Sequence, residues 1–211
     1  MAKAPKGITS DFSGRVGNVV GYKIKGTQYM RGFPDHYNYE RTKEGDARHE
    51  KFKAVSKFLK TIKSSIIKPS WDKHANNNIG RNLFTSVNYE AFTEDGRIGD
   101  FSKLILTLGD IPLPENIKIS ANNIDMEITW DFDRRSSLGD PDDVAKLCYF
   151  FKNDDFCDVY YKTLGKREDK LGFCVLDFVN DSVDNQFAFY LYFENYNCTA
   201  LSESIYFELD L

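Results

Sequence analysis

The side chains that most often act as general bases in enzymes are scarce in this chain. Its three histidines are His36, His49 and His74, and none of them stands in a recognisable catalytic motif. A hydrolytic triad needs such a base beside a serine or cysteine nucleophile, with a third group that orients the base. The sequence therefore predicts no catalytic residue, and we expect a protein that is not an enzyme.

Metal-ligating side chains show no spacing typical of a metal site. The cysteines form no CxxC pair and have no histidine at zinc-ligand spacing, so we expect buried, reduced thiols. The acidic runs at 140–143, 153–155 and 181–184 lack the spacing of a calcium-binding loop and suit polar turns. The sequence predicts neither a metal nor a cofactor. The four cysteines are Cys148, Cys157, Cys174 and Cys198.

Glycines near the N-terminus raise the question of a phosphate-binding loop. Gly14, Gly17 and Gly21 do not form GxGxxG between a strand and a helix, and no GK[ST] follows them. Gly14 to Gly17 has the Gly-x-x-Gly form of a nucleic-acid-binding loop, but that loop joins two helices. We expect these glycines to provide positive φ angles or the close approach of another backbone.

Basic and aromatic side chains at the N-terminus form the main candidate for an interaction site. A polyanion could bind them by displacing counterions. A lysine face also keeps an amphipathic helix in solution, and lysine suits bidentate phosphate contacts less well than arginine. The candidate interaction residues are Arg15, Val19, Tyr22, Lys23, Lys25, Tyr29 and Arg31. The basic helix positions beside them are Lys51, Lys53, Lys57, Lys60, Lys63 and Lys68.

The elements that would position these residues follow from hydrophobic periodicity. Residues 16–24 and 27–31 predict a β-hairpin. Apolar side chains three and four residues apart predict a helix over 42–68, which we expect Pro69 to end, and a second helix over 79–92. We expect the two helices to pack antiparallel, with the hairpin beside them.

Beyond residue 101 the hydrophobic period changes to two. Met126, Ile128 and Trp130 alternate with acidic and polar residues, which predicts a strand with one buried face. Seven short strands separated by turns are typical of an immunoglobulin-like or fibronectin-III-like β-sandwich. The predicted strands lie at 103–108, 124–132, 145–152, 156–162, 173–179, 187–193 and 205–209.

The predicted fold class is α+β, with two domains of opposite charge. Residues 1–95 form the hairpin and helix module, and residues 96–211 form the sandwich. Residues 1–88 carry 17 Lys and Arg against 7 Asp and Glu, whereas residues 89–211 carry 11 against 25. This asymmetry predicts attraction to an acidic partner or between neighbouring copies.

No stretch approaches the roughly 18 apolar residues of a membrane helix, and residues 1–7 lack the apolar core of a signal peptide. We therefore expect a cytoplasmic location, or incorporation into a virion-like particle assembled there, and no membrane partner.

The run Asp11 to Lys23, DFSGRVGNVVGYK, resembles the opening signature of a bacterial family known only as a domain of unknown function. Asp100 to Leu106, Trp130 and Ser202 to Tyr206 are similar to its later landmarks. The resemblance implies a two-part architecture and no activity. The chain departs from the family pattern Arg-Ser-x-Pro, because it reads Arg-Gly-Phe-Pro at 31–34.

Three functions fit these observations. The first is a structural or interaction protein that joins a homo-oligomer or larger assembly, phage-like or cellular. The second is a nucleic-acid-binding accessory protein that uses the basic N-terminal module. The third is ligand or carbohydrate recognition through Tyr160, Tyr161 or Tyr196, which rests on analogy with the fold class. No small-molecule substrate is inferred.

Overall fold

The chain divides by its internal contacts into two units, Met1–Thr42 and Lys43–Leu211. The expected boundary after residue 95 therefore lies elsewhere: the helices belong to the same unit as the sandwich. The structure is a computed structural model. It describes residues 12–24, 26–34, 42–76, 79–95, 97–122, 125–135, 138–151, 159–176 and 187–208.

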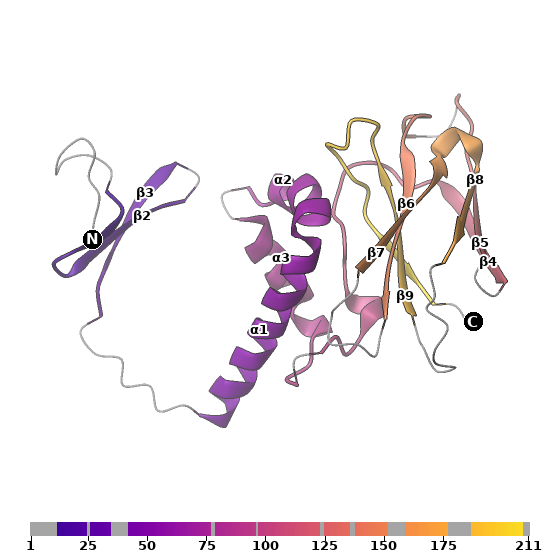
Figure 1. The fold of residues 1–211 in the computed structure, drawn as a ribbon. Helices are drawn as coiled ribbons and strands as arrows, with labels where there is room; N and C mark the ends of the chain where they lie inside the picture. Colours follow the sequence, from indigo (N-terminus) through magenta and orange to yellow (C-terminus); the bar gives the residue numbers. More distant parts are fainter. Residues whose placement is uncertain are drawn as a thin grey trace. The chain divides into compact units, whose positions relative to one another are not determined.

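The first unit contains a three-stranded antiparallel sheet in the order β1-β2-β3 (Figure 1). The expected hairpin forms, but the strand expected over 16–24 is interrupted. Gly17 adopts a φ of +57° in a turn with Asn18, so the chain reverses direction there. The strands are β1 Gly14–Val16, β2 Val19–Ile24 and β3 Thr27–Gly32.

The first helix of the second unit continues past the proline that we expected to end it. The helix α1 (Lys43–Ile62) leads into a π-helical segment, η1 (Lys63–Trp71), and then into α2 (Asp72–His74). Pro69 lies inside η1. In an α-helix a proline ring clashes with the carbonyl four residues earlier. A π-turn bonds over five residues instead, so its wider backbone accommodates the ring.

The second helix forms as expected. It consists of α3 (Gly80–Asn88) and the 3₁₀ turn η2 (Tyr89–Ala91). A further 3₁₀ turn, η3 (Phe101–Lys103), follows it.

The prediction of a strand at 103–108 is wrong. Side chains, rather than a neighbouring strand, form hydrogen bonds with the backbone groups of this segment. Trp71 Nε1 donates to the Leu106 carbonyl over 2.9 Å, and Leu108 N donates to Ser70 Oγ over 2.7 Å.

The β-sandwich expected in the C-terminal half is confirmed. One antiparallel sheet has the order β4-β5-β8 and the other the order β10-β9-β6-β7. The edge strand β4 escaped the sequence analysis because its side chains are polar or only partly buried. The strands are β4 Glu115–Asn122, β5 Asp125–Asp131, β6 Val144–Phe151, β7 Val159–Lys166, β8 Leu171–Val175, β9 Phe187–Glu194 and β10 Ile205–Phe207.

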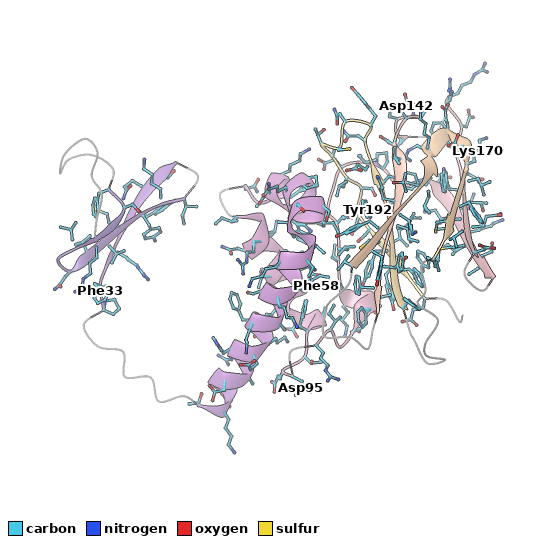
Figure 2. All side chains as sticks on the ribbon, in the orientation of Figure 1. Phe33, Phe58, Asp95, Asp142, Lys170 and Tyr192 are labelled. Carbon is cyan, nitrogen blue, oxygen red and sulfur yellow. The ribbon has the colours of Figure 1, made fainter. Side chains whose placement is uncertain are left out.

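Two hydrophobic cores make the second unit a three-layer structure. One core fills the space between the two sheets, and the other lies between the helices and the outer face of the four-stranded sheet. Phe58, labelled in Figure 2, projects from α1. Its ring contacts that of Phe150 of β6, with centroids 5.6 Å apart. The strand β9 is consequently buried on both faces. Because this shared core joins helices to sheet, the contacts do not divide at residue 95.

Within the described parts of the chain, no helix is long and apolar enough to cross a membrane.

Candidate functional site

The candidate interaction residues lie on a sheet whose two faces differ. Directly opposed residues of an antiparallel pair share a face. Tyr22 pairs with Tyr29, and Val20 pairs with both Arg15 and Arg31, so these five residues define one face. We call it the aromatic face. The opposite face, which we call the apolar face, carries Val16, Val19, Lys23, Gln28 and Met30.

Two ring contacts organise the aromatic face and its border. Tyr22 and Tyr29 stack with ring centroids 5.7 Å apart and planes inclined by 18°. The guanidinium carbon of Arg15 lies 3.6 Å from the centroid of the Phe33 ring, a cation–π contact. Arg15 Nε also donates to the Gly17 carbonyl over 2.8 Å. These contacts hold exposed aromatic rings beside basic side chains.

The apolar face exposes side chains that a folded protein usually buries. Met30 is 66% exposed, Val16 51% and Val19 40%. Phe12 lies over Gly21, where an added Cβ would come within 2.6 Å of the Phe12 ring. The amide of Gln28 donates to the Phe12 carbonyl over 2.8 Å. Phe12 therefore covers only the middle of this face, and the rest remains open to a partner.

The structure separates the seven candidate residues into two groups. Arg15, Tyr22, Tyr29 and Arg31 lie together on the aromatic face, whereas Val19 and Lys23 lie on the apolar face. Lys25 lies outside the described residues. The sequence analysis missed Val16, Met30 and Phe33 as exposed apolar side chains. Alternation relates residues within one strand only. The pairing of Gly21 with Met30 is what places Met30 on the same face as Val19.

The sheet also offers strand edges. In the order β1-β2-β3 each outer strand has a single neighbour among the described strands. The free backbone groups of an edge strand can pair with a strand from another chain. The interaction surface thus combines exposed apolar side chains, basic side chains and backbone donors and acceptors.

Two of the basic helix positions have partners within the second unit. Lys51 Nζ lies 4.3 Å from the centroid of the Tyr89 ring, and Lys53 pairs with Glu50 over 3.1 Å. Lys57 and Lys60 are exposed on α1, and Lys68 lies in η1. The side chain of Lys63 lies outside what the structure describes.

Two of the three histidines lie in the described part of the chain. His49 is exposed on α1, His74 ends α2, and His36 lies outside the described residues. No group of three or more His, Cys, Asp or Glu side chains among the described residues could hold a metal ion.

The cysteine prediction is correct at two positions and wrong at a third. Cys148 and Cys174 are free and buried, and burial raises the pKa of the Cys148 thiol, which keeps it protonated. Cys198 is exposed, because it lies in a turn with a φ of +55° rather than on a strand. Cys157 lies outside the described residues.

Of the three acidic runs, the one at 140–143 lies in the described residues and has a structural role. The Asp140 carboxylate accepts from the backbone N–H of Asp142 over 2.9 Å, and buried Asp143 pairs with Arg167. The runs at 153–155 and 181–184 lie outside the described residues.

The three tyrosines considered for ligand recognition do not form one site. Tyr160 stacks on Tyr149 with ring centroids 5.1 Å apart, while the neighbouring Tyr161 hydroxyl accepts from Ser65 Oγ over 2.8 Å. Tyr160 and Tyr161 therefore point to opposite faces of β7. Tyr196 is 72% exposed in a turn.

Comparison with known proteins identifies the family but no activity. None of the curated proteins matches the chain. Among solved structures, the solution structure of the third fibronectin III domain of human KIAA0343 protein is similar, with 15% sequence identity and a TM-score of 0.32. That likeness covers 47% of this chain and 82% of the other. A family model described as a family of unknown function, DUF6266, matches residues 11–208. Because that match spans nearly the whole chain, the protein belongs to the DUF6266 family of unknown function.

Proposed function

We propose that the protein is a non-enzymatic interaction protein, a subunit of a larger assembly that docks through its N-terminal sheet. The exposure of Val16 and Met30 on the apolar face carries this proposal. A three-stranded sheet without a core of its own has marginal stability in water. Burial of these side chains against another copy of the chain would supply the missing stabilisation.

Charge and strand edges support self-association. Residues 1–88 are strongly basic and residues 89–211 strongly acidic, so the first part of one copy attracts the second part of another. Strand addition at β1 or β3 would give the contact its orientation. Head-to-tail contacts of this kind produce rings or filaments, as in cellular and phage-like assemblies.

Light scattering of the purified full chain across a salt series tests this proposal. We expect the wild type to have the mass of two or more chains, and Met30→Glu to shift it to one chain, because a charge would be buried at the contact. Leu138→Glu is the matched control, since Leu138 is 77% exposed outside the sheet and its substitution should leave the mass unchanged. A wild type that remains a monomer at all salt concentrations would contradict the proposal.

The aromatic face favours a second candidate function, binding of single-stranded nucleic acid. Tyr22 and Tyr29 present rings on which bases could stack, and Arg15 and Arg31 lie on the same face. Fluorescence anisotropy with a labelled oligonucleotide should then show affinity that falls steeply between 50 and 200 mM salt. Tyr22→Ser should weaken binding, whereas Met30→Ser on the apolar face should not. Equal binding by both variants would exclude the aromatic face as the surface that binds nucleic acid.

We further infer that the sandwich is of the fibronectin-III-like type, that the family is bacterial and that the assembly forms in the cytoplasm. The strand orders β4-β5-β8 and β10-β9-β6-β7 support the first inference.

A further inference from the structure

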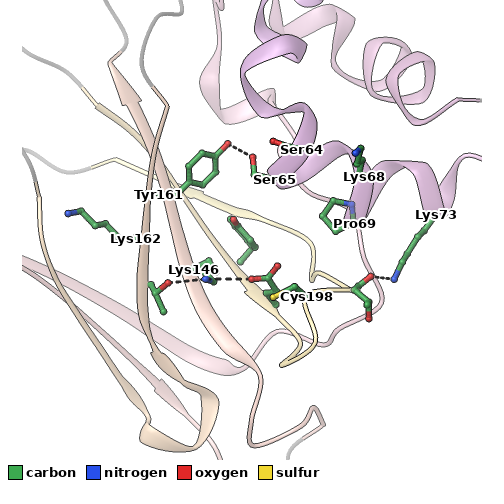
Figure 3. Close-up of a pocket in the computed structure, with 13 residues that line it drawn as sticks. Ser64, Ser65, Lys68, Pro69, Lys73, Lys146, Tyr161, Lys162 and Cys198 are labelled. Atoms are coloured by element: carbon green, nitrogen blue, oxygen red, sulfur yellow. Dashed lines mark hydrogen bonds and ion pairs between the residues drawn. The ribbon is translucent and has the colours of Figure 1, made fainter.

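A cavity of about 540 Å³ opens between the π-helical segment and the four-stranded sheet, within the second unit (Figure 3). The segment η1 and the helix α2 form one wall, and the strands β6, β7 and β9 form the other. This volume lies in the range of small-molecule sites, roughly 300–1,000 Å³. The cavity lies wholly within Lys43–Leu211, so its function does not depend on docking by the N-terminal sheet.

The cavity lies where the outer face of the sheet changes from apolar to polar. Cys148 on β6 and Tyr190 on β9 face the helices and belong to their shared core. Two residues further along the same face are Lys146 and Tyr192, which line the cavity; Tyr192 still belongs to the core, whereas Lys146 does not. The helical layer therefore covers the apolar part of this face and leaves its polar end accessible.

The opposite wall is the irregular part of the helix. Ser65, Lys68 and Pro69 of η1 and Lys73 of α2 line the cavity. The π-helical turns that accommodate Pro69 determine where these side chains project. Such turns occur frequently at functional sites.

The cavity concentrates positive charge. Lysines 68, 73 and 146 line it, against a single acidic side chain among the described lining residues, Glu194. Lys162 of β7 borders the cavity, but it pairs with Leu147, so its side chain lies on the opposite face of the sheet. Lys146 lies 3.6 Å from Glu194, and both side chains are largely buried, at 27% and 15% exposure. Residues 89–211 are otherwise strongly acidic. Lys68 and Lys73 come from the basic first part of the chain and Lys146 from the acidic second part, so the fold brings them together at one space.

Hydroxyl groups supplement the lysines. Ser65 Oγ donates to the Tyr161 hydroxyl over 2.8 Å, and Lys146 Nζ donates to Thr163 Oγ1 over 2.9 Å (Figure 3). Burial raises the pKa of Tyr161, so its hydroxyl remains protonated. Hydroxyl and ammonium donors around one space are the groups that bind the oxygens of an anion.

We propose that this cavity is a binding site for a small phosphorylated ligand. A phosphate group carries up to two negative charges and three acceptor oxygens, which several lysines can bind as point charges beside hydroxyl donors. The lysines and hydroxyl groups gather around one space of small-molecule size, whereas a polymer would need an extended groove. Lys68 and Lys73 on the helical wall contribute charge at the cavity, and the Lys146–Glu194 pair lies on the sheet opposite them.

Isothermal titration calorimetry of the full chain tests the site with four probes at equal ionic strength: pyrophosphate, a hexose phosphate, citrate and a single-stranded oligonucleotide. Saturable one-to-one binding of pyrophosphate or the hexose phosphate is expected, and the tighter of the two distinguishes a free phosphate ligand from a phosphate ester. Binding of citrate as tight as that of both phosphates would overturn the phosphate assignment. Preferential binding of the oligonucleotide would overturn the small-ligand assignment.

Lys68→Gln and Lys73→Gln should each weaken binding about tenfold, since each removes one charge-assisted contact. Lys118→Gln is the matched control, because Lys118 is exposed on β4 in the other sheet, and we expect less than a twofold change. Unchanged melting temperatures without ligand would show that the variants fold. Equal losses in all three variants would mean that general charge, not the cavity, binds the anion.

Cys198 gives an independent readout that requires no substitution. Its thiol is exposed and lines the cavity, whereas Cys148 and Cys174 are buried. Saturating pyrophosphate should slow the alkylation of Cys198 by iodoacetamide. Mass spectrometry of the peptide that contains Cys198 measures the rate. An alkylation rate at Cys198 that pyrophosphate leaves unchanged would place the ligand elsewhere.

Discussion

Arg167 and Asp143 form a buried ion pair at one end of the sandwich core. Arg167 Nη2 and Nε lie 3.1 and 3.2 Å from the same carboxylate oxygen of Asp143. Nη2 also donates to the Pro112 carbonyl over 2.7 Å, and the guanidinium carbon lies 4.5 Å from the Phe193 ring centroid. Burial lowers the pKa of Arg167 and raises that of Asp143, while their mutual attraction opposes both shifts.

Asp143→Ala should lower the free energy of unfolding by about 3–5 kcal/mol, because it leaves a buried guanidinium without its carboxylate. Chemical denaturation measures this change. The double variant Asp143→Leu with Arg167→Met should lose less than Asp143→Ala, since it removes both charges. A double variant that is less stable than Asp143→Ala would contradict this explanation, because the unpaired guanidinium would then not cause the loss.

Asn88→Ala should lower the free energy of unfolding by roughly 2–4 kcal/mol, because two buried backbone groups would lose their partner. The Asn88 side chain donates to the Ile105 carbonyl over 3.1 Å and accepts from the Ile105 N–H over 2.7 Å. Thermal and urea denaturation measure the loss. Ser86→Ala, on the exposed side of α3, is the control and should change stability by less than about 0.5 kcal/mol.

Gly21→Ala should disrupt the N-terminal sheet, since the new methyl group would overlap the ring and carbonyl of Phe12. Amide hydrogen exchange over residues 19–32 should become faster. Gly32→Ala is the matched control, because nothing lies within 4 Å of a Cβ added there. Equal protection in the two variants would mean that Phe12 does not hold the sheet.

A chain that begins at Lys43 should melt within about 4 °C of the full chain, because both hydrophobic cores lie beyond that residue. A chain that begins at residue 96 should fail to fold, because it lacks the helical side of the shared core. Circular dichroism during heating measures both. Cooperative melting of the chain that begins at residue 96 would support the domain boundary that the sequence predicted after residue 95.

Asp100→Asn should destabilise the protein near neutral pH but not in acid. The Ser102 hydroxyl and the Lys103 ammonium lower the pKa of Asp100 in the folded protein. A lowered carboxyl pKa contributes stability above its unfolded value, and this contribution disappears as the pH falls through the folded value. The difference in unfolding free energy from the wild type should therefore shrink below about pH 4. Asp95→Asn, with the same charge change at an exposed position, is the control.

Local periodicity was sufficient to predict the two helices, the N-terminal hairpin and six of the seven sandwich strands. Each of these elements buries one face against a neighbour, so its apolar residues recur at the helical or strand period. Met126, Ile128 and Trp130 of β5 illustrate this, since all three are buried between polar neighbours. The glycine prediction holds for the same reason, because positive φ at Gly17 is a local property.

The remaining features depend on contacts between residues far apart in the sequence. The polar strand β4 pairs at an edge, the segment at 104–108 bonds to Ser70 and Trp71, and the helix passes through Pro69. The charged cavity exists only because Lys68 and Lys146, 78 positions apart in the printed sequence, line one space. A sequence determines which face of an element is apolar, whereas tertiary packing decides what covers that face and where the cover ends.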